Sequence, residues 1–453
     1  MLTSFEISPV LAAEGDIDEA IRQLYRDSSD RIQTALAGGE ASEAVPAAEQ
    51  SSEEVVDLGF FGMAGKRAPI VNVVNLMIEE ALKAGASDIH LEPYEREVRV
   101  RYRIDGGLLE AFMLPKRYQS AFLTRLKIMA QLDITENRLP QDGRFKVRLG
   151  NREVDFRVSV LPVSFGNKVV MRALEKSNLS IGLDQLGFLP ESLRAFQKAV
   201  ARPYGMILVT GPTGSGKSTT LYSILNQMND PGRNILTVED PVEYQLDGVT
   251  QVQVNPEIKL TFVNALRAFL RQAPDVVLVG EIRDAETADI AIKASLTGQI
   301  VLSTLHTNDA PSAVTRLIDM GVDPFLLASS LIFVAAQRLC RQICARCRVP
   351  DEAKDQDLLG LGLELPLAKG KVIYRAAGCP ACRNTGYRGR FAILEAMLID
   401  DPVREMIIAR RPPDEIKAYA RAHGMRSLRQ EGLVHLVNGR TGIEEIMRVT
   451  SEE

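Results

Sequence analysis

Eight consecutive residues near the middle of the chain have the types and spacing that bind a polyphosphate. They are Gly211, Pro212, Thr213, Gly214, Ser215, Gly216, Lys217 and Ser218, which fit the pattern GxxxxGK[ST]. The glycines let successive backbone N–H groups turn toward the phosphates. Lys217 adds a positive charge, and the Ser218 hydroxyl can hold Mg²⁺ at the start of the next helix. Because an apolar run at 206–209 precedes the loop like a buried strand, the sequence predicts a site for ATP and Mg²⁺.

Three later strand ends carry polar side chains that such a site requires. Glu281 follows an apolar strand at 276–279, so it is the favoured partner for Mg²⁺ or for the attacking water. Glu239, at the end of another strand, is a candidate general base, and His306 lies where it could sense the terminal phosphate. A lone acid at a strand end is more often a helix cap, and a lone His more often a core residue. Together with the loop, the three residues support one interpretation.

Phosphoryl transfer needs more positive charge than Lys217 alone supplies, so we expect arginines from a neighbouring domain or subunit. Arg157 and Arg172 lie on predicted strands that are otherwise patterned for burial, where an unpaired guanidinium is costly. They are predicted to reach the nucleotide in a closed state. Arg267 and Arg271 are spaced i, i+4 and therefore share one helix face ahead of the 276–279 strand. For each arginine the alternative is a structural ion pair.

Four cysteines form two CxxC units separated by 31 residues: Cys344, Cys347, Cys379 and Cys382. Four thiolates in this arrangement predict one tetrahedral Zn²⁺ site. A disulfide conflicts with the reducing compartment predicted below, and a thioredoxin-type redox pair would not require two CxxC units. Cys340 is the odd cysteine, and we predict that it is a buried apolar residue on the last turn of a helix, with exchange for a zinc ligand as the alternative.

The segments around these residues alternate between strand and helix patterns. With 453 residues and 45% hydrophobic content, the chain is large enough for several folded domains. Short apolar strands alternate with helices at 187–342, which is typical of a largely parallel α/β sheet. Helical spacing at 70–83 and alternation at 98–104 indicate a smaller α+β domain before it. The solvated face of the 98–104 strand is predicted to carry Arg99, Arg101 and Arg103.

We therefore divide the chain into five segments. Residues 16–36 have helical spacing, and residues 37–54 are rich in Ala, Ser, Gly and Glu, which is typical of a flexible linker. The predicted segments are a short helix and linker at 1–66, an α+β domain at 67–180, an ATPase domain at 187–342, a tetracysteine zinc element at 343–390 and a helical C-terminal domain at 391–453.

Composition limits where the chain acts and on what. No apolar run reaches the roughly 18 residues that a membrane span requires; the most apolar stretch, 325–336, is predicted to be a buried helix. The first residues do not resemble a secretory signal, so we predict a cytoplasmic protein that is at most peripherally attached to a membrane. A net charge of −5, 6% aromatic residues and no Trp disfavour a nucleic-acid partner.

The motifs resemble a known family. The stretches GPTGSGKSTT, ILTVEDPVEYQLDGVTQVQVN, LRQAPDVVLVGEIRDAETADIA and TGQIVLSTLHTNDA resemble the boxes of the type II/type IV secretion superfamily of ATPases, which includes GspE/PulE secretion motors and PilB pilus-extension motors. ASDIHLEP and RLPQDGR resemble the preceding domain of that family. The resemblance implies a Walker A loop at 211–218, an aspartate box around Glu239, a Walker B strand ending at Glu281 and a histidine box containing His306. It also implies that Arg267 and Arg271 line the same site.

The resemblance implies a RecA-like phosphate-loop domain, preceded by a smaller α+β (PAS-like) domain. It also implies that the chains assemble into a homohexameric ring. The implied activity is ATP hydrolysis that moves an inner-membrane platform protein, with a cytoplasmic-membrane anchor protein as a second partner. Among family members, EDPVEYQLDG and DMGVDPFLLASSL favour a type II secretion motor, which drives pseudopilus assembly, over a type IV pilus extension motor. The tetracysteine segment argues against a retraction motor. A RecA-like nucleic-acid motor and a nucleotide-bound scaffold without turnover are the alternatives from other classes.

Overall fold

The computed structural model describes residues 55–57, 69–175, 181–351, 362 and 372–451. The chain divides into two compact units, Met1–Lys176 and Ser177–Glu453, and each is described by itself. The helix predicted at 16–36 and the linker predicted at 37–54 lie outside the described residues.

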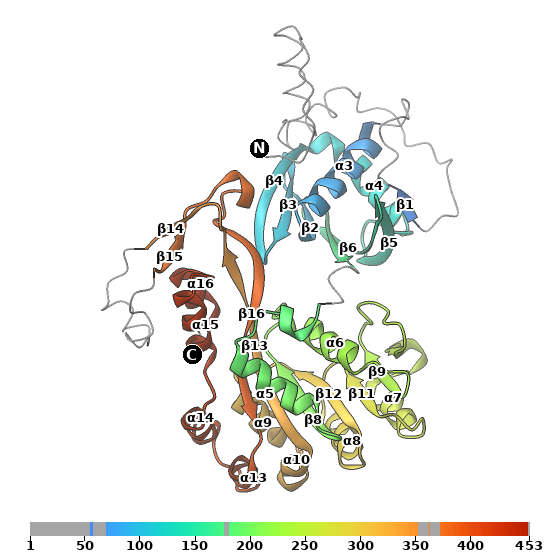
Figure 1. The fold of residues 1–453 in the computed structure, drawn as a ribbon. Helices are drawn as coiled ribbons and strands as arrows, with labels where there is room; N and C mark the ends of the chain where they lie inside the picture. The colour runs from blue at the N-terminus through green and yellow to red at the C-terminus, as the bar shows by residue number, and fades with distance from the viewer. Residues whose placement is uncertain (1–54, 58–68, 176–180, 352–361, 363–371, 452–453) are drawn as a thin grey trace. The chain divides into compact units, whose positions relative to one another are not determined.

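The N-terminal unit is built on a seven-stranded sheet with the order β1-β5-β6-β7-β2-β3-β4. Neighbouring strands are antiparallel except for the parallel pair β1 and β5. Its elements are β1 (Val55–Asp57), α3 (Pro69–Lys83), β2 (Ala86–Pro93), β3 (Glu97–Ile104), β4 (Gly107–Pro115), η2 (Lys116–Tyr118), α4 (Gln119–Met129), β5 (Gln141–Leu149), β6 (Arg152–Val163) and β7 (Gly166–Glu175). Helices α3 and α4 share one core with the sheet (Figure 1).

Alternation along β3 confirms the predicted strand. Val98, Val100 and Tyr102 are buried in the core shared with α3 and α4. The arginines between them are half-buried on the opposite face, where Arg99 and Arg101 pair with Glu92. The predicted solvated face is therefore a partly buried row of ion pairs.

The C-terminal unit contains a second seven-stranded sheet, in the order β10-β9-β11-β12-β8-β13-β16. All its pairs are parallel except β13 with β16. Its elements up to the last strand are η4 (Leu183–Gln185), α5 (Pro190–Val200), β8 (Gly205–Thr210), α6 (Lys217–Met228), β9 (Ile235–Glu239), β10 (Thr250–Gln253), η5 (Pro256–Ile258), α7 (Phe262–Phe269), β11 (Val276–Val279), α8 (Ala285–Leu296), β12 (Ile300–Leu305), α9 (Ala310–Asp319), α10 (Pro324–Ser330), β13 (Leu331–Ile343) and β16 (Tyr387–Leu398).

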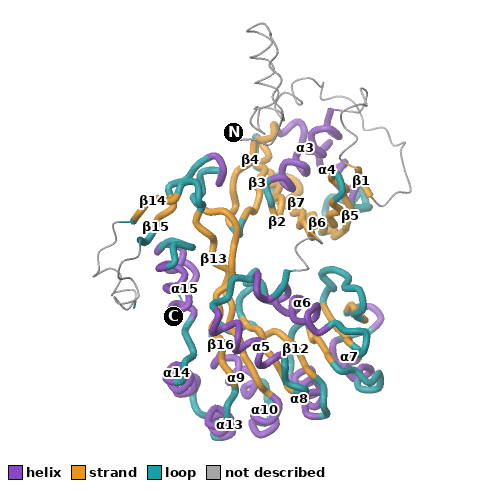
Figure 2. The backbone as a smooth tube through the Cα atoms, in the orientation of Figure 1, coloured by secondary structure: helices purple, strands orange, loops and turns teal. Residues whose placement is uncertain are grey.

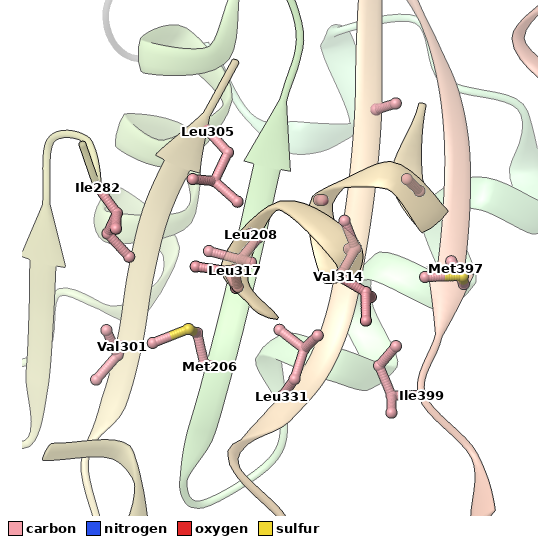
Figure 3. Packing of buried hydrophobic residues seen from close by; sticks show 14 of the residues in the cluster. Met206, Leu208, Ile282, Val301, Leu305, Val314, Leu317, Leu331, Met397 and Ile399 are labelled. Carbon is pink, nitrogen blue, oxygen red and sulfur yellow. The ribbon is translucent and has the colours of Figure 1, made fainter. Parts of the chain in front are cut away.

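Helices cover both faces of this sheet, which is why its central strands are continuous apolar runs rather than alternating ones. Every residue of β8, β9, β11 and β12 is buried. One core lies under α5 and α6, and the other lies under α7, α8, α9 and α10 (Figure 2). In the second core, Leu317 of α9 packs near Leu208 of β8 (Figure 3). Because helices pack on both faces, the sheet is held firmly, and so are the strand ends that carry the polar residues.

The helix predicted at 325–336 is wrong. Helix α10 ends at Ser330, and β13 begins at the next residue. A short apolar run is compatible with either structure, and pairing with β8 and β16 decides the outcome here. Cys340 therefore lies on a strand, opposite Phe391, and not on a helix; its predicted burial is confirmed.

The sheet also extends past the predicted end of the ATPase domain at residue 342. Strand β16 lies beyond the cysteines, yet it runs antiparallel to β13 along the edge of the sheet (Figure 1). The segment between them holds β14 (Arg348–Pro350), β15 (Tyr374–Ala376) and η6 (Pro380–Cys382). The residues predicted as a zinc element and as a helical domain thus share a strand that belongs to the ATPase sheet.

Four helices follow β16: α13 (Asp401–Ile408), α14 (Pro413–Ala422), α15 (Leu428–Val437) and α16 (Ile443–Val449). They belong to the C-terminal unit and pack against its other elements through buried polar contacts as well as apolar ones. The Glu431 carboxylate of α15, for example, accepts a hydrogen bond from the Ser192 hydroxyl of α5 at 2.9 Å. Among the described residues, no helix is both long enough and apolar enough to cross a membrane.

Candidate nucleotide site and tetracysteine centre

The phosphate loop joins β8, near the middle of the parallel sheet, to α6 (Figure 1). Two of its glycines are required by close approach as well as by backbone conformation. Gly211 and Gly216 have φ values of +147° and +87°. A Cβ atom on Gly211 would lie 2.5 Å from the Gln337 carbonyl oxygen, and one on Gly216 would lie 2.8 Å from Gln337 Nε2. Larger residues would therefore push the loop away from β13.

Gln337 of β13 holds this loop in place through two side-chain hydrogen bonds. Its side-chain amide donates to the Ser215 carbonyl at 2.8 Å, and its side-chain oxygen accepts from the Thr220 hydroxyl at 2.8 Å. Sequence reasoning missed Gln337. The signal was present, since a glutamine inside an apolar run needs partners if it is buried.

Lys217 lies folded against the loop. Its ammonium donates to the carbonyls of Gly211 at 2.7 Å and Pro212 at 3.1 Å. Burial lowers the pKa of Lys217 to about 8; the nearby Arg338 guanidinium adds to this, and the Glu281 carboxylate opposes it. The Ser215 hydroxyl is buried and has no hydrogen-bond partner among the residues that the structure describes. A half-buried cation and a buried hydroxyl donor fit a loop that binds anionic phosphate oxygens.

Glu281 and His306 come together beside Lys217, as the parallel strand ends require. One Glu281 oxygen lies 3.5 Å from His306 Nε2, and the other lies 2.5 Å from Arg283 Nη2. Arg283 was not identified from the sequence, although it stands only two residues after Glu281. The Glu281 carboxylate also acts electrostatically on Lys217. The ends of β11 and β12 and the phosphate loop after β8 thus place an acid, a histidine and a lysine at one edge of the sheet.

Glu239 lies at the end of β9 in a different environment. It is only 5% exposed, and side chains of the protein surround its carboxylate. One oxygen accepts from the hydroxyl of Tyr222, and the other accepts from Thr237 Oγ1 at 2.6 Å and Gln251 Nε2 at 3.2 Å. The carboxylate is thus occupied by three donors, and its role as a general base remains a prediction.

Two of the four predicted arginines, Arg267 and Arg172, make ion pairs of the kind named as the alternative. Arg267 Nη2 lies 2.5 Å from Glu286, with both side chains exposed, and Arg271 Nη1 donates to the Arg267 carbonyl at 2.9 Å. In the N-terminal unit, Arg172 Nε pairs with Asp88 at 2.9 Å. The Arg172 side chain is 61% exposed, so the expectation of a buried guanidinium is wrong there. Arg157 lies opposite Arg172 on the neighbouring strand.

The four cysteines meet at one point. Their sulfur atoms all lie within 4.8 Å of one another. The Cys344 and Cys379 sulfurs are 3.9 Å apart, and the Cys382 sulfur is 3.7 Å from that of Cys347 and from that of Cys379. Zn–S bonds of about 2.3 Å in a tetrahedron place sulfurs about 3.8 Å apart, so these distances fit one zinc ion. They are far too long for disulfides, whose S–S bond is about 2.05 Å.

Backbone groups also prepare this centre for a cation. Burial alone would raise the pKa of Cys382, but hydrogen bonds from the N–H groups of Cys379 and Gly386 outweigh it and lower that pKa to about 7. A thiolate is the form that binds a metal. Cys340 is not part of the cluster.

A largely parallel sheet with helices on both faces, a glycine-rich loop between an interior strand and a helix, and an acid at the end of another interior strand together define a P-loop ATPase. Within that class, a family model described as "Type II/IV secretion system protein" matches residues 63–448, so the chain belongs to this family. The resemblance read from the motifs is confirmed.

Individual relatives agree with this placement. The chain is 47% identical to the type IV pilus assembly ATPase PilB of Myxococcus xanthus over 100% of this chain and 79% of that protein. It is 46% identical to the type II secretion system ATPase E of Vibrio cholerae over 97% of this chain and 86% of that protein. Among solved structures, the pilus retraction motor PilT with bound ADP is 27% identical, with a TM-score of 0.57 over 83% of this chain and 96% of PilT.

A second solved structure shows the fold alone. The ATPase DotB of Legionella pneumophila is 19% identical, with a TM-score of 0.63 over 88% of this chain and 100% of that one. The predicted α/β ATPase fold is therefore confirmed.

Proposed function

We propose that this chain is the ATP-hydrolysing motor of a type II secretion machine and that it drives pseudopilus assembly at the inner membrane. The observation that carries the proposal is the complete phosphate-loop site in a chain that is 46–50% identical to type II secretion system E proteins of several bacteria. Type IV pilus extension is the second candidate, because the Myxococcus xanthus PilB protein is equally similar over the whole chain.

The residues of the site take distinct roles in this proposal. Backbone N–H groups of the loop and Lys217 bind the ATP phosphates, and Ser218 holds Mg²⁺, which when bound neutralises phosphate charge. Glu281, held by His306 and Arg283, orients the water or the metal. Glu239 accepts the proton of the attacking water.

Arginines complete the positive charge around the transferring phosphate in this proposal. Arg267 and Arg271 belong to the same unit as the phosphate loop, whereas Arg157 and Arg172 belong to the N-terminal unit. Each would leave its present contact, such as the Arg172 pair with Asp88, when the nucleotide binds. The exposed Arg267 pair with Glu286 contributes little stability, so exchanging it for a phosphate is feasible. The buried Asp88 would keep Arg103 as a partner after Arg172 leaves.

We further propose that the chain acts as a homohexamer with a PAS-like N-terminal domain, and that the ATPase domain extends beyond residue 342 to include β16. Its partners would be an inner-membrane platform protein and a membrane anchor protein, and it would work in the cytoplasm, peripheral to that membrane. Zn²⁺ on the four cysteines would fasten the excursion between β13 and β16. The acidic total charge supports a function without nucleic acid.

The test combines biochemistry with complementation. Purified protein should hydrolyse ATP, and single-stranded or double-stranded DNA should not stimulate it. The gene should restore export in a host whose type II secretion ATPase is deleted. A wild-type protein that binds ATP without turnover would support the scaffold alternative. Restored pili without restored secretion would favour the pilus motor, and stimulation by DNA would favour a nucleic-acid motor.

A further inference from the structure

A buried hydrogen bond links the nucleotide-binding helix to the end of a neighbouring strand. Tyr222 lies on α6, five residues after Lys217, and Glu239 is the last residue of β9. The Tyr222 side chain is 1% exposed, and its hydroxyl donates to one carboxylate oxygen of Glu239. Because a buried carboxylate without donors is costly, this bond restricts where the Glu239 side chain can lie.

The other oxygen of Glu239 is held by separate elements. Thr237 donates from the same strand and Gln251 from β10. Gln251 is itself fixed, because its amide also donates to the Tyr244 carbonyl at 3.1 Å and its oxygen accepts from the Leu246 N–H at 2.7 Å. The carboxylate therefore has three donors from three elements, and only the Tyr222 donor comes from the helix that begins at the phosphate loop.

Helix α6 begins with Lys217 and Ser218, which bind phosphate in the proposed function, so a nucleotide at the loop would contact this helix directly. Tyr222 is one and a half turns further along the same helix. Burial, followed by the charge of Glu239, raises the pKa of Tyr222, so its hydroxyl remains a donor at neutral pH. The helix can thus pass a change at the phosphates directly to the Glu239 carboxylate.

We propose that the Tyr222 hydroxyl positions the Glu239 carboxylate for ATP hydrolysis and so couples the phosphate-binding helix to the general base. Tyr222 is a positioning residue, since it acts through Glu239 and not on the substrate. The inference rests on the proposed ATP hydrolysis and on the proposed role of Glu239 within it.

A second buried tyrosine offers a matched control. The Tyr244 ring packs against the Tyr222 ring with centroids 4.4 Å apart and an interplanar angle of 74°. The Tyr244 hydroxyl is buried but has no hydrogen-bond partner within the described part of the chain. Replacing either tyrosine with Phe removes one hydroxyl from the same pair of rings, and only one of the two changes removes a bond to Glu239.

The experiment measures steady-state ATP hydrolysis for the wild type, Tyr222→Phe, Tyr244→Phe, Glu239→Gln and the double variant Tyr222→Phe/Glu239→Gln. Tyr222→Phe should lower kcat about tenfold or more while KM changes less than about twofold, because misplacement of a reacting group costs rate and not binding. Tyr244→Phe should change kcat less than about twofold. The double variant should be no slower than Glu239→Gln alone, since coupled residues are not additive.

Several results would overturn the inference. Equal kcat values for the two Phe variants would do so, and so would losses that add independently in the double variant. An unchanged kcat in Glu239→Gln would also overturn it. A faster Tyr222→Phe enzyme would mean that the bond restrains Glu239 and does not position it. Loss of ATP binding in Tyr222→Phe would indicate a structural role. If that variant does not fold, Thr237→Val removes the 2.6 Å donor instead and should lower kcat without changing KM; an unchanged kcat there overturns the inference. A wild-type protein without turnover refutes the proposed function instead.

Discussion

The nucleotide site and the tetracysteine centre are assembled in opposite ways. The nucleotide site collects residues from β8, β11, β12 and β13, whose order is fixed by a sheet buried on both faces. The tetracysteine centre instead joins two short turns, one directly after β13 and one before β16, beside a sheet of only two strands. A large core positions the first site, whereas the proposed Zn²⁺ would supply much of the order at the second. Damage to one should therefore leave the other intact.

The largest effect should come from Lys217→Ala. The change deletes the loop's cation, so ATP turnover should fall about 100-fold or more, as when other preorganised charges are removed from a transition state. Zinc content should remain at one ion per subunit, because the cysteines lie in another part of the unit. Turnover assays and metal analysis of the same preparation check both statements. Loss of zinc in this variant would contradict the independence of the two sites.

The reverse change is Cys379→Ser with Cys382→Ser. Zinc should fall from one ion per subunit toward zero and thermal stability should drop, because metal binding contributes to folding of the segment. ATP binding should remain measurable. Cys340→Ser is the control. Cys340 is fully buried on β13, but it is not one of the predicted ligands, so this variant should keep its zinc. Wild-type protein without zinc, or double variant with full zinc, would refute the ligand set.

The same contrast explains what the sequence alone could predict. The phosphate loop and the CxxC units are local, so their types and spacing identify them. The polar Gln337 inside an apolar run indicates that it needs partners, but the partners of Gln337 and Tyr222 became visible only in three dimensions, because they are not adjacent in sequence. Gln337 braces Ser215 across the sheet, and Tyr222 meets Glu239 from a helix. Neither contact leaves a spacing pattern in the chain.

Strand pairing caused the errors in the predicted elements. The apolar run at 325–336 satisfies helix and strand patterns alike, and only its neighbours β8 and β16 make its second half a strand. Strand β16 itself follows the whole cysteine excursion before it returns to the sheet. The length of the segment between β13 and β16 does not indicate that the chain returns to the same sheet. The predicted end of the ATPase domain, residue 342, therefore lies before its last strand.

A smaller effect should follow from Gln337→Leu. The variant replaces the side-chain amide with an apolar side chain of similar size and so removes the bonds to Ser215 and Thr220. Because each such bond contributes roughly 0.5–1.5 kcal/mol, the KM for ATP should rise about tenfold while zinc content stays unchanged. Titration with ATP measures the first quantity. An unchanged KM would mean that the loop is held by its own backbone and not by β13.

The smallest effect is a pH dependence that only the nucleotide site should show. In the free protein, burial lowers the pKa of Lys217 to about 8, and bound phosphates would raise it because they favour the cation. ATP binding therefore takes up a proton above pH 8, and affinity is lost as pH rises through the free-state value. Between pH 7 and 8.5 the dissociation constant for ATP should increase about fourfold by linkage. Lys217→Arg remains charged throughout this range, so its affinity should not show this loss. Calorimetry in buffers of different ionisation enthalpy measures the proton uptake directly. Equal pH dependence in the wild type and the Arg variant would assign the effect to another group, and no dependence in the wild type would mean that Lys217 keeps an ordinary pKa.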